Sequence, residues 1–240
     1  MTAIRFYGAG LPGLDSTSLP GRLIVIEGTD GVGRSTQIAL LKEWLEASGF
    51  AVVDTGLRRS ALAGRGIERA KRGHTLDPVT LQLMYATDFC DRLEHQIVPA
   101  LRAGMVVLTD RYIYSLIARA AIRDISREWL SNLFGFALVP DRVFYLDIDV
   151  EQLAPRVLES TGFDYWESGQ DHLRGWDVYH NFSRYQGKLL KEFRRMAPDY
   201  DFVTIDARRD IEDIFRDLKD GIEVVVEGMA LDQVERITQP

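Results

Sequence analysis

The sequence predicts an α/β fold with a five-stranded parallel sheet and helices on both faces. Short apolar runs alternate with segments of helical spacing, and this alternation is typical of parallel strands joined by crossover helices. A glycine-rich turn follows the first run, and an Asp-Arg pair follows the third, where a parallel sheet presents the carboxyl ends of its strands. The expected strands are residues 23–26, 50–53, 105–109, 142–148 and 202–205.

Length and composition indicate a soluble globular chain. Its 240 residues are 46% hydrophobic and 27% charged, with a net charge of −7 and a pI of about 5.2. This balance argues against non-specific binding to nucleic acid or to a membrane surface. The single cysteine, Cys90, excludes an internal disulfide, and no apolar run approaches the ~18 residues of a membrane span. We therefore expect a cytoplasmic protein.

The first strand leads into a turn that matches the phosphate-binding pattern G-x-x-x-x-G-K-[ST] at every position but one. Gly28, Gly33 and Ser35 fit, whereas Arg34 stands where lysine is expected. Glycines allow successive backbone N–H groups to turn around a phosphate, and the following helix aims its positive end at the same anion. The alternative is a glycine-rich turn without a ligand. The residues expected to bind nucleotide phosphates are Gly28, Thr29, Asp30, Gly31, Val32, Gly33, Arg34, Ser35 and Thr36, with the Ser35 hydroxyl directed to Mg²⁺.

Two charged clusters follow the second and third strands. Arg58-Arg59-Ser60 comes after the second strand, and Asp110-Arg111-Tyr112 comes after the third. Open α/β sheets bind ligands at the carboxyl ends of their strands. Asp110 is a candidate Mg²⁺ ligand and Arg111 a candidate phosphate clamp. The alternatives are a solvated basic loop at 58–60 and an Asp110–Arg111 salt bridge that caps the strand.

Helices and a lid connect the strands. Asp77-Pro78 marks the start of a long helix that Pro99 is expected to end or kink, and His95 on it is interpreted as a surface residue. The polar stretch 161–177 is typical of a mobile lid. We expect an N-terminal extension at 1–21, a main domain at 22–220 and a tail at 221–240, with further helices at 128–138, 150–160, 179–196 and 211–219.

Between Leu23 and Ala207, these pieces together resemble the thymidylate kinase family of P-loop nucleoside monophosphate kinases. The motifs that carry the resemblance are Ile26–Gln37, the arginine loop Arg58-Arg59-Ser60, Tyr85–Asp88, Asp110-Arg111-Tyr112 with Ser115, Pro140-Asp141 through Asp147, Asp164 with Glu167, Tyr185, and Ile205–Ala207.

The resemblance implies transfer of the γ-phosphoryl group of ATP to a deoxynucleoside monophosphate, with dTMP as acceptor and Mg²⁺ as the metal. Arg34 and the loop N–H groups would bind the ATP phosphates, and Ser35 and Asp110 would serve Mg²⁺. Arg59 and Arg111 would orient the acceptor phosphate, and Asp30 would hold the sugar 3′-hydroxyl. Phe89 would either stack on the base or pack in the core. The family also implies a homodimer.

The chain departs from the family pattern at several positions. Phe89 replaces a helix arginine, so Arg92, one helical turn later, is the candidate that supplies its charge. Tyr165 stands at the position of the lid arginine, with Arg174 as the nearest cation. Arg119 follows Ala118, where the family usually has tyrosine, so Arg119 is counted among the substrate-binding candidates.

These departures leave two alternatives. Arg119 and Phe89 would suit a kinase for another monophosphate, such as dUMP or a modified nucleotide. Arg34, Tyr165 and the arginine-poor lid would suit a non-catalytic nucleotide-binding protein. Against the second, Arg59, Asp110 and Arg111 are retained, and a pure ATP binder does not need them.

Overall fold

The computed structural model describes residues 5–14, 19–160, 162–173 and 177–238, and its sheet confirms the predicted fold class. The order of the five strands is β2-β3-β1-β4-β5, and every pairing is parallel. β1 is the central strand and is buried on both sides, as the apolar run predicts. The strands are β1 (Arg22–Gly28), β2 (Val52–Gly56), β3 (Val106–Asp110), β4 (Arg142–Asp147) and β5 (Phe202–Asp206).

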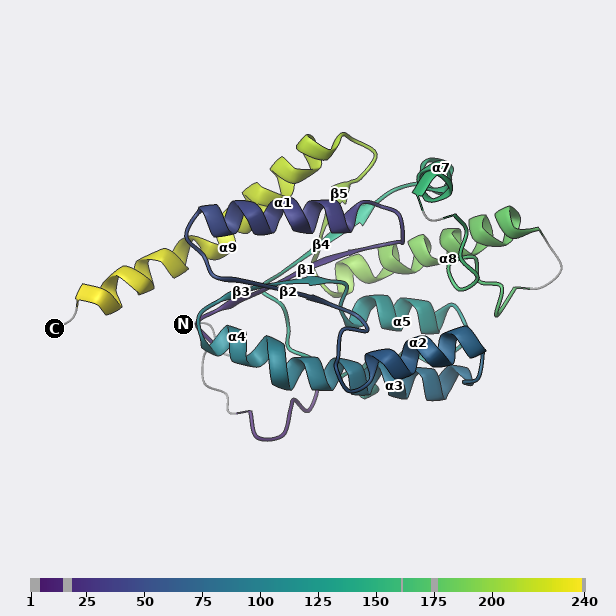
Figure 1. Ribbon diagram of the computed structural model, residues 1–240, viewed down its shortest axis with the longest axis horizontal. Coiled ribbons are helices and arrows are strands. Elements are labelled where there is room, and N and C mark those ends of the chain that lie inside the picture. Colours follow the sequence, from purple (N-terminus) through teal and green to yellow (C-terminus); the bar gives the residue numbers. More distant parts are fainter. Residues whose placement is uncertain (1–4, 15–18, 161, 174–176, 239–240) are drawn as a thin grey trace.

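Helices cover both faces of the sheet (Figure 1). α1 (Arg34–Ala47) and α9 (Ile211–Thr238) lie on one face, while α3 (Pro78–Arg92), α4 (Val98–Arg102) and α5 (Ile113–Ala121) lie on the other. Alternate residues of β1 feed the two cores, with Ile24 and Ile26 on the α1 side and Leu23 and Val25 on the α5 side. The other helices are α2 (Gly64–Gly73), α6 (Arg127–Leu133), α7 (Val150–Ser160) and α8 (Val178–Asp199).

The prediction that Pro99 ends or kinks the long helix is only partly right. A π-helical segment, η1 (Leu93–Ile97), follows α3 directly, and α4 begins at Val98 with Pro99 in its first turn. The Val98 N–H donates to the Leu93 carbonyl, five residues back. Proline has no N–H to donate, and its position in the first turn after the wider π-helical segment is where a helix tolerates it. The chain therefore continues as helix through Pro99.

Two segments near the ends of the described chain pack against the domain. α9 continues past the predicted end at Lys219, and the buried side chains of Ile222 and Val226 join the core on the α1 side. Near the N-terminus, Phe6 pairs with Leu138, and the Tyr7 and Tyr114 hydroxyls lie 2.5 Å apart. Among the described residues, no helix combines the length and apolar character needed to cross a membrane.

Candidate active site

The turn after β1 has the backbone shape of an anion-binding loop. Gly28, Gly31 and Gly33 adopt φ values of 150°, 77° and 103°, which disfavour residues with side chains. At Gly31 a Cβ atom would also collide with the Cγ2 atom of Val157. The N-cap residue of α1, Gly33, has no side chain to cap the helix. The first-turn N–H groups therefore remain available to a phosphate.

Arg34 folds back onto this loop. Its Nε donates to Oδ1 of Asp110 at 2.7 Å, and its Nη1 donates to the carbonyl oxygens of Gly28, at 2.6 Å, and of Thr29. Burial opposes ionisation of Asp110, but Arg34 and then Arg111 outweigh it and hold the pKa of Asp110 below its ordinary value. Among the described residues, Nη2 of Arg34 has no hydrogen-bond partner, so it can donate to a bound phosphate.

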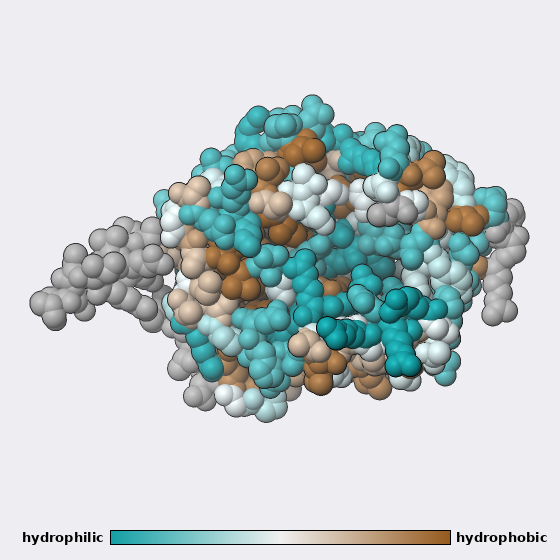
Figure 2. All heavy atoms as spheres, in the orientation of Figure 1, coloured by the Kyte–Doolittle hydropathy of each residue, from teal (hydrophilic) through white to brown (hydrophobic). Residues whose placement is uncertain are grey.

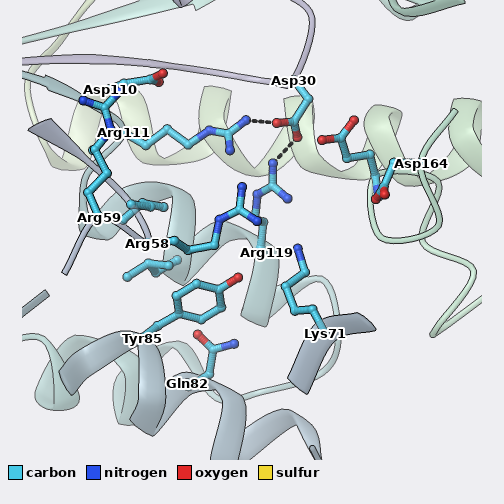
Figure 3. A pocket seen from close by; sticks show the side chains of 14 residues that line it. Asp30, Arg58, Arg59, Lys71, Gln82, Tyr85, Asp110, Arg111, Arg119 and Asp164 are labelled. Carbon is cyan, nitrogen blue, oxygen red and sulfur yellow. Dashed lines mark hydrogen bonds and ion pairs between the residues drawn. The ribbon is translucent and has the colours of Figure 1, made fainter. Parts of the chain in front are cut away.

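A cavity of about 520 Å³ opens beside the loop, at the carboxyl ends of β2 and β3 (Figure 3). Figure 2 shows hydrophilic residues around a hollow in the same part of the surface. Tyr85 and Gln82 of α3 contribute to its lining. The charged residues of the lining are Asp30, Arg58, Arg59, Lys71, Asp110, Arg111, Arg119, Asp164 and Glu167.

Asp30 forms ion pairs with two arginines in this cavity. Nη2 of Arg111 donates to Oδ1 of Asp30, and Nη2 of Arg119 donates to Oδ2 (Figure 3). Burial opposes ionisation of Asp30, but the two guanidinium groups prevail and hold its pKa well below the ordinary range. Arg111 also has a φ of 71°, in the left-handed region. The structure thus brings together the predicted residues Asp30, Arg111 and Arg119.

Arg59, which the sequence analysis predicts to bind the acceptor phosphate, lines the same cavity from the loop after β2. Its Nη1 donates to Oδ2 of Asp54 at 3.0 Å, and its side chain is 48% exposed. An exposed ion pair contributes little stability. Arg59 is therefore free to exchange this partner for a bound anion.

The described part of the predicted lid packs against α2 and against the turn that follows α5. The Trp166 indole N–H donates to the Lys71 carbonyl at 3.3 Å, and the His74 ring stacks 5.5 Å from Trp166. On the other side, Nε of Arg123 donates to Asp171 at 2.7 Å. Asp164 and Glu167 are thereby held in the cavity wall. Arg174, the predicted lid cation, lies outside the described residues.

Glu167 is expected to make the free energy of unfolding of the protein depend on pH. Burial, and then the Asp30 carboxylate, raise the pKa of Glu167 from 4.5 to about 7. Between these values the folded protein holds a proton that the unfolded chain has lost, so the free energy of unfolding should fall as pH rises. The expected fall is on the order of 1–3 kcal/mol. Urea unfolding at pH 5 and pH 7 measures it. The variant Glu167→Gln should show a flatter pH dependence, and an unchanged dependence would contradict the assignment.

Phe89 and Arg92 are corrections to the predicted site. Both side chains are fully buried on α3 and neither lines the cavity. The Phe89 ring lies 4.9 Å from that of Tyr112, and the Nε atom of Arg92 donates to Asp88 at 3.1 Å. On α3, Tyr85 lines the cavity. One helical turn later, at Phe89, the aromatic rings of Tyr112 and Phe134 cover the helix. Phe89 therefore packs in the core, which was one of its two expected roles.

The variant Phe89→Ala should consequently lose stability without changing base preference. Truncating a fully buried phenylalanine costs about 3–5 kcal/mol. Urea unfolding measures this loss, and activity with each monophosphate, at a temperature where the variant is folded, measures the preference. A changed ranking of monophosphates, with little loss of stability, would return Phe89 to the base site.

The sequence analysis missed one charged residue of the cavity lining, Lys71, and one buried carboxylate, Glu27, that binds the segment after β3. Glu27 is fully buried at the end of β1, where it accepts the Tyr112 N–H at 2.8 Å and the Ser115 hydroxyl at 2.7 Å. Burial raises its pKa. The sequence did contain a signal for Glu27, because it follows the predicted apolar strand directly and a buried carboxylate needs hydrogen-bond donors around it. Lys71 had no comparable signal. Its pKa is lowered to about 8 by burial, then by Arg119 and Arg58.

A second cavity, of about 410 Å³, lies on the other side of the loop. Gly31, Gly33 and Thr36 line it from the loop and the start of α1. Val32 and Gln37 also line it, and the rest of the wall consists of Arg156 of α7, residues 209–212 after β5, and Ile214. The glycine-rich turn thus contributes residues to both cavities, so ligands in either cavity would lie next to a phosphate bound on the turn.

Comparison with known proteins agrees with this geometry. The sequence model of the thymidylate kinase family matches residues 26–218. The "Probable thymidylate kinase 2" of Saccharolobus solfataricus is 33% identical over 201 residues, which are 83% of this chain and 94% of the relative. The "Probable thymidylate kinase" of Thermococcus gammatolerans is 31% identical over 85% of this chain and 96% of its own length. The "Thymidylate kinase" of Brachyspira hyodysenteriae is 32% identical over 60% of this chain and 72% of its own length. The chain described here belongs to the thymidylate kinase family.

Proposed function

We propose that the protein transfers the γ-phosphoryl group of ATP to dTMP, giving dTDP. The observation that carries this proposal is the pair of cavities that meet at the glycine-rich turn. One exposes Asp30 with its arginines, and the other exposes Gly31, Gly33 and Thr36. A donor in the second cavity and an acceptor in the first would face each other across the loop. Phosphoryl transfer depends mainly on such positioning and on neutralising charge.

On the donor side, the backbone N–H groups at the start of α1 and Nη2 of Arg34 bind the ATP phosphates. The magnesium ion enters as part of the MgATP substrate. The Ser35 hydroxyl is exposed at the start of α1, and among the described residues Oδ2 of Asp110 accepts no hydrogen bond. These are oxygen donors of the kind that Mg²⁺ prefers when phosphates supply most of its ligands. Both residues therefore fit the predicted role.

On the acceptor side, Arg59 and Arg111 bind the monophosphate and Asp30 accepts a hydrogen bond from the sugar hydroxyl. Asp30 suits this role because it stays ionised between its two arginines. Tyr85 offers its ring to the base from the cavity floor. The lid covers this cavity and limits access of water, which would otherwise accept the phosphoryl group.

A cytoplasmic location and a homodimer belong to the same proposal. Val79 and Leu83 lie on the outer face of α3 and are 50% and 47% exposed. They offer an apolar contact between two copies. Sedimentation equilibrium of the wild type and of Leu83→Lys tests the dimer. A wild-type chain that stays monomeric at micromolar concentration would remove it from the proposal.

A panel of acceptors tests the reaction. ADP release from MgATP is measured with dTMP, dUMP, dCMP, dGMP and dAMP offered singly. We expect strong stimulation by dTMP. Stronger stimulation by another monophosphate would replace dTMP as the acceptor. No stimulation by any of them, with ATP still bound, would favour a non-catalytic nucleotide-binding protein.

A further inference from the structure

A buried ion pair on α3 holds the arginine loop that lines the acceptor cavity. Asp88 and Arg92 are both fully buried, and Nε of Arg92 donates to Oδ2 of Asp88 at 3.1 Å. The same carboxylate accepts the backbone N–H of Arg58 on Oδ2 at 3.0 Å and that of Ser60 on Oδ1 at 3.1 Å. Asp88 therefore joins the core of the domain to the loop at 58–60.

The loop needs this support because its backbone is constrained. Arg58 adopts a φ of 62°, which residues with side chains disfavour. Its carbonyl oxygen lies 2.5 Å from the point where a Cβ of Gly64 would stand. Asp91 adds a third contact from α3, because its Oδ2 accepts the Ser60 hydroxyl at 2.5 Å. Two carboxylates of one helix thus fix the loop that presents Arg58 and Arg59 to the cavity.

Stability alone does not account for this pair. Both Nη1 and Nη2 of Arg92 are buried without a hydrogen-bond partner among the described residues. Burial lowers the pKa of Arg92 despite the nearby Asp88. Buried ion pairs with unsatisfied groups add little net stability, and apolar replacements are often as stable. The contact that such a replacement could not reproduce is the one from Asp88 to the two loop amides.

We propose that Asp88 and Arg92 are positioning residues for the acceptor phosphate. Asp88 fixes the backbone of the loop so that Arg58 and Arg59 face the cavity, and Arg92 orients the Asp88 carboxylate through its hydrogen bond. This inference rests on the proposed function, because it takes the loop as the site of the monophosphate. It also assigns Arg92 a role through Asp88 in place of direct contact with the substrate.

The double variant Asp88→Asn with Arg92→Met separates positioning from stability. Arg92→Met alone leaves a buried, unpaired carboxylate and should be strongly destabilising. The double variant leaves no buried charge, so its unfolding midpoint in urea should recover most of the way to wild type. Its KM for dTMP should nevertheless stay raised about tenfold or more, with kcat/KM lower by on the order of 10²-fold and KM for ATP unchanged.

Glu192→Gln supplies a matched control. Glu192 is another buried carboxylate in an arginine pair, with Arg127 donating to both of its oxygens at 2.8 and 2.7 Å, but it lies outside the cavity lining. This variant should lose stability and keep the wild-type KM for dTMP. A KM that recovers together with stability in the double variant would overturn the proposal, since the pair would then be purely structural.

Amide hydrogen exchange measures how firmly the loop at 58–60 is held, and it needs no substrate. Protection of the Arg58 and Ser60 amides should fall in Asp88→Asn and in the double variant, but not in Glu192→Gln. Unchanged protection would overturn the positioning role whatever the enzyme phosphorylates. Conversely, an inactive wild type would count against the proposed function and leave the loop measurement to be judged by itself.

Discussion

Replacing Arg34 with alanine should lower kcat on the order of 10²–10³-fold, as expected for the loss of a charged group that stabilises the transition state. The side chain binds the carbonyl oxygens of Gly28 and Thr29 and pairs with Asp110, so it shapes the loop and would place a cation beside the phosphates of the proposed donor. Steady-state ADP release at saturating ATP and dTMP measures the effect.

Arg34→Lys is the control for this variant. It restores the residue usual at this position of the pattern and keeps the charge, although it loses the planar fork. We expect its turnover to stay within about tenfold of wild type, which corresponds to ~1.4 kcal/mol. Wild-type turnover in Arg34→Ala would show that Arg34 does not act on the phosphates.

Arg111→Ala should cause a loss of similar size, on the order of 10²–10³-fold in kcat/KM for dTMP. Two interactions disappear together, because Arg111 contributes to the acceptor cavity and also binds Asp30. Asp30 would keep Arg119 alone, and its pKa would rise toward the ordinary value. Initial rates against dTMP concentration measure the loss.

Arg65→Ala is the matched control for Arg111. Arg65 is an exposed arginine of α2 outside the cavity lining, so its loss should leave the kinetics unchanged. If Arg111→Ala behaved like Arg65→Ala, the acceptor phosphate would have to bind elsewhere.

The local motifs were readable from the sequence because each depends on a short stretch of chain. The turn at 28–33 needs glycines at fixed spacing, and Asp110-Arg111 comes at the carboxyl end of a strand whose other residues are buried. Parallel strands then bring these stretches to one edge of the sheet, where the structure finds them. The five strands were predicted for the same reason, since a buried parallel strand is a short apolar run.

The roles predicted for Phe89 and Arg92 depended on how far the cavity extends along α3, which the sequence does not show. Tyr85, Phe89 and Arg92 lie along α3, yet only Tyr85 reaches the cavity. Helical spacing predicts that these residues lie on one face of α3. It does not predict that core aromatic residues cover that face at Phe89 while the cavity lies at Tyr85. Lys71 was missed because α2 carries no motif, and only the folded chain brings it next to the lid.

Transfer of labelled phosphate tests the central claim most directly. The protein is incubated with Mg²⁺, dTMP and ATP that carries a radioactive γ-phosphate, and the products are separated by chromatography. We expect the label in dTDP, because the proposed acceptor cavity adjoins the glycine-rich loop and the proposed lid would limit access of water. Label that stays in ATP, or that appears only in inorganic phosphate while dTMP is bound, would contradict the assignment of this protein as a dTMP kinase.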